Sequence, residues 1–377
     1  MSIKAEKSFS LKDQLFNAGS VGELSARLAL AHAGFQRKKF EQEVLRRFPQ
    51  LELKERMTWI VTVLEAHLPR NFIAAQDILL RALPEPLDPA KTDDDYGKFI
   101  WMVPADYAAK HGCTAEHLAV ALNFLREATQ RGSAEGAIRP FLQKFCAETM
   151  VFVHECAEDE NYHVRRLASE GIRPLLPWAP RAHVPLDEII AVLDRLHADP
   201  TRYVTRSVCN NLNDIAKLDP DKVITTLKRW HKQKRQRPAE LSWMTRHALR
   251  TLLKEDHPSA LELIGYPLTP RFRLSQVRST DRVQVGESYV WEGRLTSLAE
   301  QRLKITLRLG FLKANGKHSA KVFAVKDVSM KKGEELIISK QLPFKPITTR
   351  VLYPGAHTAE LIVNGIVRGQ QEFELVA

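Results

Sequence analysis

The sequence predicts a mainly α-helical protein, with a HEAT-like α-helical solenoid followed by a small immunoglobulin-like β-sandwich domain. Three observations predict this class. Apolar residues recur with helical spacing through the N-terminal two thirds of the chain. One of these helical patterns returns with a period of about 40 residues, as in stacked helix pairs. From residue 271 the apolar period changes from 3.6 to 2, which is typical of β-strands.

The N-terminal region is predicted to be helical and to be broken at prolines. Four helices are expected over Val21–Leu30, Phe40–Arg47, Leu53–Leu68 and Phe72–Leu83, with breaks at Pro49, Pro69 and Pro84. A polar, proline-rich loop spans residues 84–98. Helical spacing then resumes in Phe99–Val103, Ala105–His111, Ala115–Arg131 and residues 142–160.

A helix over residues 162–172 gathers charged side chains and a tryptophan. Its apolar stripe consists of Val164, Leu167, Ala168 and Ile172. Arg166 and Glu170 lie at i and i+4 on another face. Pro174 and Pro177 end the helix, so Trp178 lies on the loop that follows. A carboxylate, arginines and a tryptophan within so short a stretch are unusual for a purely structural helix.

The same template recurs in the next two helical segments. Arg166, Arg206 and Arg246 lie at successive repeats of the period, and so do Glu170, Asn210 and Arg250. In stacked repeats, equivalent positions lie side by side, so the three arginines of the first set are expected to form a row on one surface. The alternative is that they are structural arginines that bridge neighbouring repeats.

The helix over residues 204–217 carries a polar segment with poor helix propensity. Val204, Val208, Leu212 and Ile215 are expected to be buried. Arg206, Asn210 and Asp214 then lie on another face. Three asparagines and an aspartate within residues 210–214 disfavour a helix, which indicates either a functional site or an exposed polar helix end.

Glu135 lies in a glycine- and serine-containing turn before another helical segment. Ser133 is predicted to cap that helix, with Glu135 at its N-terminus. A carboxylate there favours either chemistry or simple complementarity to the helix dipole. The nearby His154-Glu155-Cys156-Ala157-Glu158 lacks the second histidine of a zincin motif, so no metal site is predicted.

The C-terminal region is predicted to be a basic β-sandwich. Short strands are expected over 282–285, 289–295, 303–309, 321–328, 335–340, 351–352, 357–363 and 372–376. Asn364-Gly365 between two apolar runs predicts a hairpin. Residues 271–377 contain 18 Lys and Arg against 10 Asp and Glu, which favours a second contact surface for a polyanion. The proline-rich segment 258–270 is the expected boundary, giving domains 1–265 and 271–377.

Composition narrows the functional class. The formal net charge is +11 and the pI is about 9.4, so a polyanionic partner is favoured. The four cysteines form no C-x-x-C pair, which indicates reduced thiols in a cytoplasmic protein. The N-terminus lacks the apolar core of a signal peptide, and no apolar run approaches about 18 residues, so no membrane span is predicted.

These motifs together resemble the AlkC branch of the AlkC/AlkD DNA alkylation-repair glycosylases. The resemblance rests on residues 163–174 with Leu176-Pro177-Trp178, on residues 133–135 with 137–141, and on residues 210–217. It implies a HEAT-like solenoid that binds duplex DNA carrying alkylated bases, and a bacterial, cytoplasmic protein of base excision repair. The implied reaction is monofunctional hydrolysis of the N-glycosidic bond of N3-methyladenine and N3-methylcytosine without base flipping. No cofactor, metal or obligate protein partner is implied, and a monomer is expected.

Carried over to this sequence, Glu135, Glu170 and Asp214 look like the acidic cluster, and Trp178 like the residue beside the lesion. Gly136 departs from the family, where a bulkier residue is expected. Carboxylates held ionised by arginines could stabilise an oxocarbenium-like sugar and aim a water molecule. Contacts to DNA are expected from Arg139, Arg165, Arg166, Arg206, Arg246, Asn210 and Arg250.

Two other functions fit the same features. A non-enzymatic HEAT-repeat scaffold for DNA or protein would use the same basic surface and would tolerate loss of the acids. An AlkD-like glycosylase for N7-alkylated purines would differ in substrate only. A binder of single strands fits less well, because few aromatic residues interleave with the basic runs.

Overall fold

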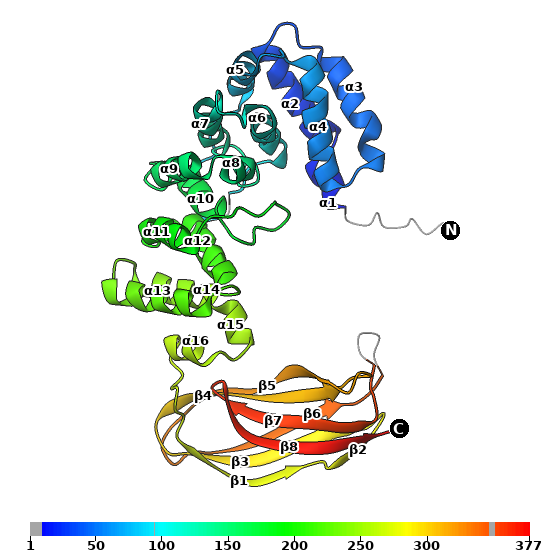
Figure 1. Cartoon of the computed structure of the whole chain (residues 1–377), viewed down its shortest axis with the longest axis vertical. Helices are drawn as coiled ribbons and strands as arrows, with labels where there is room; N and C mark the ends of the chain where they lie inside the picture. Colours follow the sequence, from blue (N-terminus) through cyan, green and yellow to red (C-terminus); the bar gives the residue numbers. More distant parts are fainter. Residues whose placement is uncertain (1–9, 94, 347–350) are drawn as a thin grey trace. The chain divides into compact units, whose positions relative to one another are not determined.

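A computed structural model describes residues 10–93, 95–346 and 351–377 of the chain (Figure 1). In the N-terminal part the helices are α1 (Leu11–Leu15), α2 (Ala18–Ala31), α3 (Arg37–Arg47), η1 (Phe48–Gln50), α4 (Leu53–His67), α5 (Phe72–Ala82), η2 (Phe99–Met102), α6 (Val103–Gly112) and α7 (Leu118–Ala128). They are followed by α8 (Arg139–Lys144), α9 (Cys146–Cys156), α10 (Tyr162–Glu170), α11 (Leu186–Leu196), α12 (Arg202–Ile215), α13 (Pro220–Gln233), α14 (Pro238–Ala248), α15 (Arg250–Lys254) and α16 (Pro258–Leu263). The strands are β1 (Phe272–Ser279), β2 (Arg282–Gln284), β3 (Ser288–Ser297), β4 (Gln301–Leu312), β5 (His318–Met330), β6 (Glu335–Pro343), β7 (Gly355–Val363) and β8 (Ile366–Val376).

The mainly helical region followed by an immunoglobulin-like β region confirms the predicted fold class. By its contacts the chain forms two compact units, Met1–Ile215 with Gln233–Ala248, and Ala216–Lys232 with Leu249–Ala377. The second unit therefore contains α13, α15 and α16 as well as the strands. The domain limits 1–265 and 271–377 stay a prediction.

The repeat found in the sequence corresponds to equivalent buried positions in three helices. Helices α10 and α12 pack together, and α12 packs against α14. Val164, Val204 and Met244 are fully buried in these helices, and so are their counterparts four residues later, Ala168, Val208 and Ala248. Side chains at i and i+4 lie on one helix face, so each helix presents the same apolar stripe to its neighbours.

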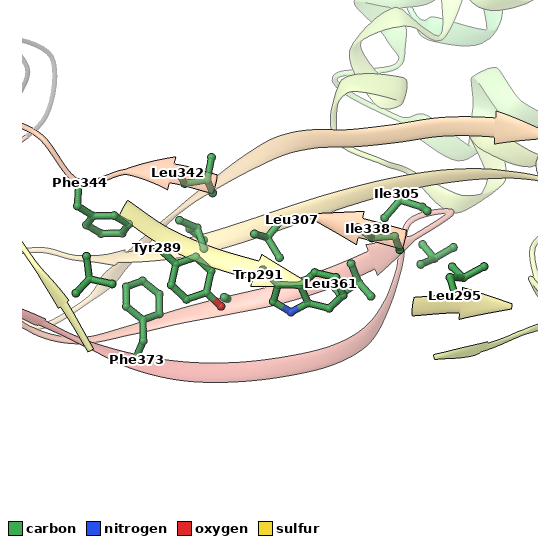
Figure 2. Close-up of a cluster of buried hydrophobic side chains, with 14 of the residues drawn as sticks. Tyr289, Trp291, Leu295, Ile305, Leu307, Ile338, Leu342, Phe344, Leu361 and Phe373 are labelled. Carbon is green, nitrogen blue, oxygen red and sulfur yellow. The ribbon is translucent and has the colours of Figure 1, made fainter. Parts of the chain in front are cut away.

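The β region of the second unit is a sandwich of two sheets. One sheet has the strand order β1-β3-β6 and the other β2-β8-β7-β4-β5, with all neighbours antiparallel except β2 and β8. Inward-facing residues of both sheets build one core, including Tyr289, Trp291, Leu307, Leu361 and Phe373 (Figure 2). Alternate residues of a strand face opposite sides, so the period of 2 in the sequence follows from this core.

Two strand predictions for the β region differ from the structure. Strand β1 was not predicted, because Gln276 has a left-handed φ of 53° and the pairing register with β3 shifts between Ser275 and Arg278. Val351 and Leu352 were predicted as a strand but belong to none. The predicted Asn364-Gly365 hairpin is confirmed: both residues have positive φ, 51° and 78°, and they join β7 to β8.

The helical end of the second unit is attached to the sandwich by buried polar contacts. Asp256, after α15, accepts a hydrogen bond from Thr306 of β4 (2.6 Å) and pairs with Lys304 (2.6 Å). Tyr266 donates to Asp327 of β5 (2.6 Å). A Cβ at Gly365 would lie 2.0 Å from the Asp256 carbonyl oxygen, so the hairpin approaches this segment closely enough to require glycine.

Three further features concern the part of the chain that the structure describes. No helix there combines the length and apolar character needed to cross a membrane. No group of three or more His, Cys, Asp or Glu side chains there could hold a metal ion. None of the four cysteines forms a disulfide there, and Cys156 and Cys209 are buried.

Candidate active site

The three predicted acids converge on one chain of alternating charges in the first unit. Glu135 pairs with Arg166 (2.6 Å), and Arg166 lies 3.8 Å from Glu170. Glu170 pairs with Arg173 (2.6 Å), whose Nε donates to Asp214 (2.9 Å). The chain therefore runs from the turn before α8, through α10 and the residues after it, to α12. Every carboxylate in it has an arginine partner.

Glu135 is held at one oxygen and is free at the other. Its Oε2 accepts hydrogen bonds from the Ser133 hydroxyl and from Arg166 Nη1 (2.6 Å), whereas Oε1 has no hydrogen-bond partner among the described residues. The prediction that Ser133 caps the next helix is wrong: α8 begins only at Arg139 and has no side-chain cap. The Ser133 side chain instead joins the charge chain, where it also accepts from Arg166 (2.6 Å).

The turn that carries Glu135 lies against α10 because residue 171 is a glycine. A Cβ at Gly171 would lie 2.7 Å from the Ile138 Cγ2 atom. Asn161 caps α10 by accepting from the His163 backbone N–H (2.8 Å), and the helix ends at Glu170. The sequence thus places Arg166 and Glu170 on the last turns of a short helix that Glu135 can reach.

Arg166 is buried among aromatic rings. Its guanidinium carbon lies 4.8 Å from the ring centre of Tyr203 and 5.8 Å from that of Tyr96. Burial by itself would lower the pKa of Arg166, but the carboxylates of Glu135 and Glu170 outweigh it and raise that pKa above its ordinary value. Arg166 is therefore a permanent cation between two acids.

Glu170 and Asp214 are buried, with 4% and 2% of their surfaces exposed. Burial would raise the pKa of Glu170, but Arg166, Arg173 and the Ser207 hydroxyl (2.6 Å) together hold it below its ordinary value. Glu170 is thus ionised at neutral pH. Of the two interpretations of the polar segment of α12, the exposed helix end is wrong, because Asn211, Asn213 and Asp214 are buried. Asp214 accepts from Arg173, and Asn211 donates to the Ser169 carbonyl oxygen of α10.

Trp178 lies at the rim of a pocket that also contains Glu135. The pocket has a volume of about 190 Å³. Trp178 is 72% exposed and has a φ of 61°, a strained conformation for a residue of its size. Lys54 donates to its carbonyl oxygen. Backbone strain at an exposed aromatic residue favours a functional role for that residue.

Arg139 does not lie where a phosphate could reach it, so its predicted DNA contact is wrong. Its side chain is fully buried. It donates to the carbonyl oxygens of Pro180 (2.8 Å), Gly171 (2.8 Å) and Arg173 (2.9 Å). Burial lowers its pKa to about 10. Arg139 thus fixes both the segment after α10 and the loop that carries Trp178.

The other predicted DNA contacts differ in exposure. Arg165 pairs with Asp199 (2.5 Å), and Arg206 pairs with Asp93 and donates to the Tyr96 hydroxyl (3.0 Å). Arg166 and Arg206 therefore both reach Tyr96, as expected for neighbouring members of one row. Arg246 is exposed, and no ion pair joins it to another described residue. Asn210 bonds His247 (3.0 Å), and Arg250 begins α15 in the second unit.

The sequence argument missed several residues of the site. Arg173 and Ser207 were not assigned roles, although Arg173 lies three residues after Glu170, within reach on the next turn. Tyr203 lies one repeat period after His163, and the centres of their rings are 5.3 Å apart. The 40-residue repeat was therefore a signal from which this pair could have been predicted. Tyr96 and Lys54 carried no local signal, because their contacts are to residues far away along the chain.

Comparisons with known proteins give the same architecture. The family described as "Uncharacterised protein YhaZ, C-terminal Ig-like domain" matches residues 274–377. YhaZ of Bacillus subtilis, an uncharacterised protein, is 30% identical over 96% of this chain and 98% of its own length. The solved structure of Pseudomonas fluorescens alkylpurine DNA glycosylase AlkC, bound to DNA containing an abasic site analog, is 30% identical. The structural match covers 98% of this chain and 100% of the AlkC chain, with a TM-score of 0.78.

Fold and site together define a helical-repeat protein with an immunoglobulin-like C-terminal region and, in the helical part, a pocket that Glu135 of the charge chain lines. Identity and coverage extend over nearly the whole of both relatives. The chain belongs to the AlkC/YhaZ family.

Proposed function

We propose that the protein is a DNA glycosylase that hydrolyses the N-glycosidic bond of cationic alkylated bases in duplex DNA, N3-methyladenine and N3-methylcytosine among them. The observation that carries this proposal is the position of Glu135. It is the acid of the charge chain that lines the pocket, beside Trp178, with an unpartnered Oε1 atom. Membership of the AlkC/YhaZ family supports the same reaction.

The main contribution that this reaction needs from the protein is electrostatic stabilisation of the sugar cation. When the bond from the base nitrogen to C1′ breaks, its electron pair passes to the base and neutralises the positive charge there. The sugar becomes an oxocarbenium ion, which a carboxylate stabilises by charge. A water oxygen then bonds C1′, and its proton passes to Glu135 or to solvent. Ser133 and Arg166 hold Glu135 through Oε2, so Oε1 is the atom that faces the sugar.

Glu170 and Asp214 are proposed to act as positioning residues. Both are too buried to touch a sugar, and both neutralise arginines of the charge chain. Trp178 offers an aromatic face to the cationic base. Arg246 and the basic C-terminal β-sandwich supply candidate contacts to the duplex backbone. The reaction is proposed to need no metal, and to proceed without extruding the lesion from the helix.

The test is single-turnover release of N3-methyladenine and N7-methylguanine from methylated duplex DNA. Wild type is compared with Glu135→Gln, Glu170→Gln and Glu240→Gln. Glu240 is a matched control, since it is a buried carboxylate held by an arginine (Arg202) and Thr205 outside the charge chain. We expect Glu135→Gln to lose at least about 10²-fold in release of N3-methyladenine. Glu240→Gln should release at the wild-type rate.

Each alternative function has its own outcome in this experiment. DNA binding with no release of either base by the wild type would indicate a scaffold. Release of N7-methylguanine in preference to N3-methyladenine would indicate an N7-alkylpurine glycosylase. Equal release by wild type and Glu135→Gln would overturn the assignment of Glu135 as the catalytic residue.

A further inference from the structure

The loop that carries Trp178 is fastened to two different helices. Arg139 of α8 donates to the Pro180 carbonyl oxygen (2.8 Å), and Gln143 of the same helix donates to that of Arg181 (2.9 Å). Lys54 of α4 donates to the carbonyl oxygen of Trp178 itself. Residues 176–179 of the loop and residues 53, 54 and 57 of α4 line the pocket together. The bond from Lys54 therefore joins two walls of the pocket.

We propose that Lys54 is a positioning residue for the Trp178 ring. By holding the carbonyl oxygen, Lys54 keeps the Trp178 backbone in its left-handed conformation, which presents the indole at the rim of the pocket. Lys54 acts through Trp178 and not by touching the base or the sugar. The role of the ring at the lesion rests on the proposed function.

The conformation of Trp178 needs support at its backbone. A φ of 61° is unfavourable for a residue with a bulky side chain. Such strain persists only where surrounding contacts fix the residue. The indole is 72% exposed, so the packing of the ring supplies little of this support. A hydrogen bond from a charged donor is roughly twice as strong as one between neutral groups, and Lys54 supplies such a bond.

Lys54 is available for this bond because nearby acids have other partners or carry little charge. Glu52 pairs with Lys12 (2.5 Å), and Glu55 accepts from the Glu52 backbone N–H (2.8 Å) at the start of α4. Burial raises the pKa of Asp106 to about 7, although the charge of Lys54 opposes this rise. The Asp106 carboxyl group is therefore only partly ionised at neutral pH and competes weakly for the Lys54 ammonium.

A ring fixed in this way suits a lesion that stays in the duplex. An exposed indole at the rim can meet a cationic base from outside. A ring that is already oriented avoids the entropy cost of ordering it when DNA binds. Misplacement of a reacting group by about 1 Å can cost about 10²-fold in rate. Loss of Lys54 should therefore slow base release more than it weakens DNA binding.

Fluorine NMR of the full-length protein with 5-fluorotryptophan tests the positioning without DNA. The chain has six tryptophans, and the Trp178 signal is the one that Trp178→Ala removes. Trp101, Trp230 and Trp291 are buried and serve as internal references for the fold. We expect Lys54→Met to move the Trp178 signal and to leave the three reference signals in place. Lys54→Arg keeps a cationic donor and should return the Trp178 signal towards its wild-type position.

Two matched controls separate this bond from other effects of the substitution. Lys144→Met removes the same charge from another exposed lysine that donates to a carbonyl oxygen, that of Cys113 (3.1 Å). Gln143→Ala removes a bond to the same loop, at Arg181. Both variants should keep the wild-type Trp178 signal and the wild-type rate of base release.

Single-turnover release of N3-methyladenine at saturating protein supplies the kinetic measurement. Lys54→Met should lose at least about tenfold in rate, while its affinity for DNA stays within about threefold of wild type. Lys54→Arg should recover most of the rate.

The outcomes distinguish the positioning role from the proposed function. An unmoved Trp178 signal in Lys54→Met, or equal behaviour of Lys54→Arg and Lys54→Met, would overturn the positioning role. A loss of DNA affinity and of its salt dependence at an unchanged rate would also overturn it, and would make Lys54 a phosphate contact. Release at the wild-type rate by Lys54→Met would overturn this role and leave the glycosylase. No release by a wild type whose Trp178 signal depends on Lys54 would overturn the glycosylase and leave the hold of Lys54 on Trp178.

Discussion

Arg139 Nη1 donates a 2.9 Å hydrogen bond to the carbonyl oxygen of Arg173, so one buried arginine positions another through its backbone. Arg173 in turn joins Glu170 to Asp214. The position of the buried acids therefore depends on α8, which contributes no side chain to the charge chain. This relationship replaces the phosphate contact expected of Arg139 from the sequence.

Removing the Arg139 guanidinium should destabilise the fold and leave the electrostatics of DNA binding unchanged. Arg139→Met deprives three carbonyl oxygens of their donor. The carbonyl oxygens of Gly171 and Arg173 are buried, whereas Pro180 is exposed. At about 1–3 kcal/mol for each buried group left unsatisfied, we expect a loss of at least about 2 kcal/mol in the free energy of unfolding, measured by urea denaturation. Gln143→Ala removes an exposed hydrogen bond on the same helix and should cost less than about 1 kcal/mol. A smaller salt dependence of DNA binding in Arg139→Met would contradict this role.

Substitution of Trp178 should separate stability from function. The side chain is 72% exposed, so Trp178→Ala is expected to change the free energy of unfolding by less than about 0.5 kcal/mol. Its φ of 61° favours glycine, so Trp178→Gly should be the more stable of the two by about 1 kcal/mol. Both variants should lose release of N3-methyladenine. Full activity in either variant would show that the ring is not needed at the lesion.

The buried His163 predicts a loss of stability in acid. Burial lowers its pKa to about 4, despite Asp95, which acts in the opposite direction, while Arg166 adds to the lowering. The unfolded chain, with a histidine pKa of about 6.5, binds the proton first. The folding free energy contributed by neutral His163 is therefore complete above pH 6.5 and falls by about 3 kcal/mol towards pH 4.

The variant His163→Phe isolates the part of the pH-dependent stability that comes from His163. Its ring can pack between Tyr162 and Tyr203, as the imidazole does. The imidazole Nε2 is buried without a hydrogen-bond partner among the described residues, so the substitution removes no hydrogen bond at that atom. The free energy of unfolding of both proteins is measured by urea denaturation from pH 4 to 8. As the pH falls, the wild type should lose about 3 kcal/mol relative to the variant. Parallel curves would contradict the assignment.

The β4–β5 hairpin offers a direct test of whether the β-sandwich contacts DNA. Lys313, Lys317 and Lys321 are exposed there. If they meet phosphates, replacing all three with alanine should reduce the slope of log K against log salt by up to about 0.9 for each phosphate that a lysine had neutralised. Arg302 and Arg308 are already paired with Asp327 and Glu360, so Arg302→Ala with Arg308→Ala should keep the wild-type slope. An unchanged slope in the lysine variant would argue against binding through this hairpin.

Local patterns predicted the elements well and their contacts poorly. Apolar periodicity located α10 and α12, and the repeat register placed Val164, Val204 and Met244 in equivalent buried positions. Periodicity cannot show that a polar face is buried, so it left open whether the asparagine-rich part of α12 is a functional site or an exposed polar helix end. The loop that carries Tyr96 could not be placed either. Its position depends on long-range hydrogen bonds such as that from the Tyr203 N–H to the Thr92 carbonyl oxygen (2.9 Å).

The site was predicted in composition but not in accessibility. The resemblance implied that Glu135, Glu170 and Asp214 form an acidic cluster, and the structure links them through Arg166 and Arg173. Glu135 reaches the pocket because of the turn that carries it and the close packing at Gly171. The sequence pattern does not show which acid is accessible. The roles of the individual acids therefore stay proposals for the kinetic experiments.

The chain of ion pairs also bears on how the repeats unfold. In a stack of helix pairs each pair ordinarily contacts only its neighbours, so fraying at one end need not disturb the middle. Here, separating α12 from α10 would break the buried contacts of Asp214 with Arg173 and of Ser207 with Glu170 together. The central repeats should therefore open as one cooperative segment, with amide protons of α10 and α12 exchanging at a common rate. A partly frayed molecule would then keep its charge chain whole until that segment opens, and lose it in a single step.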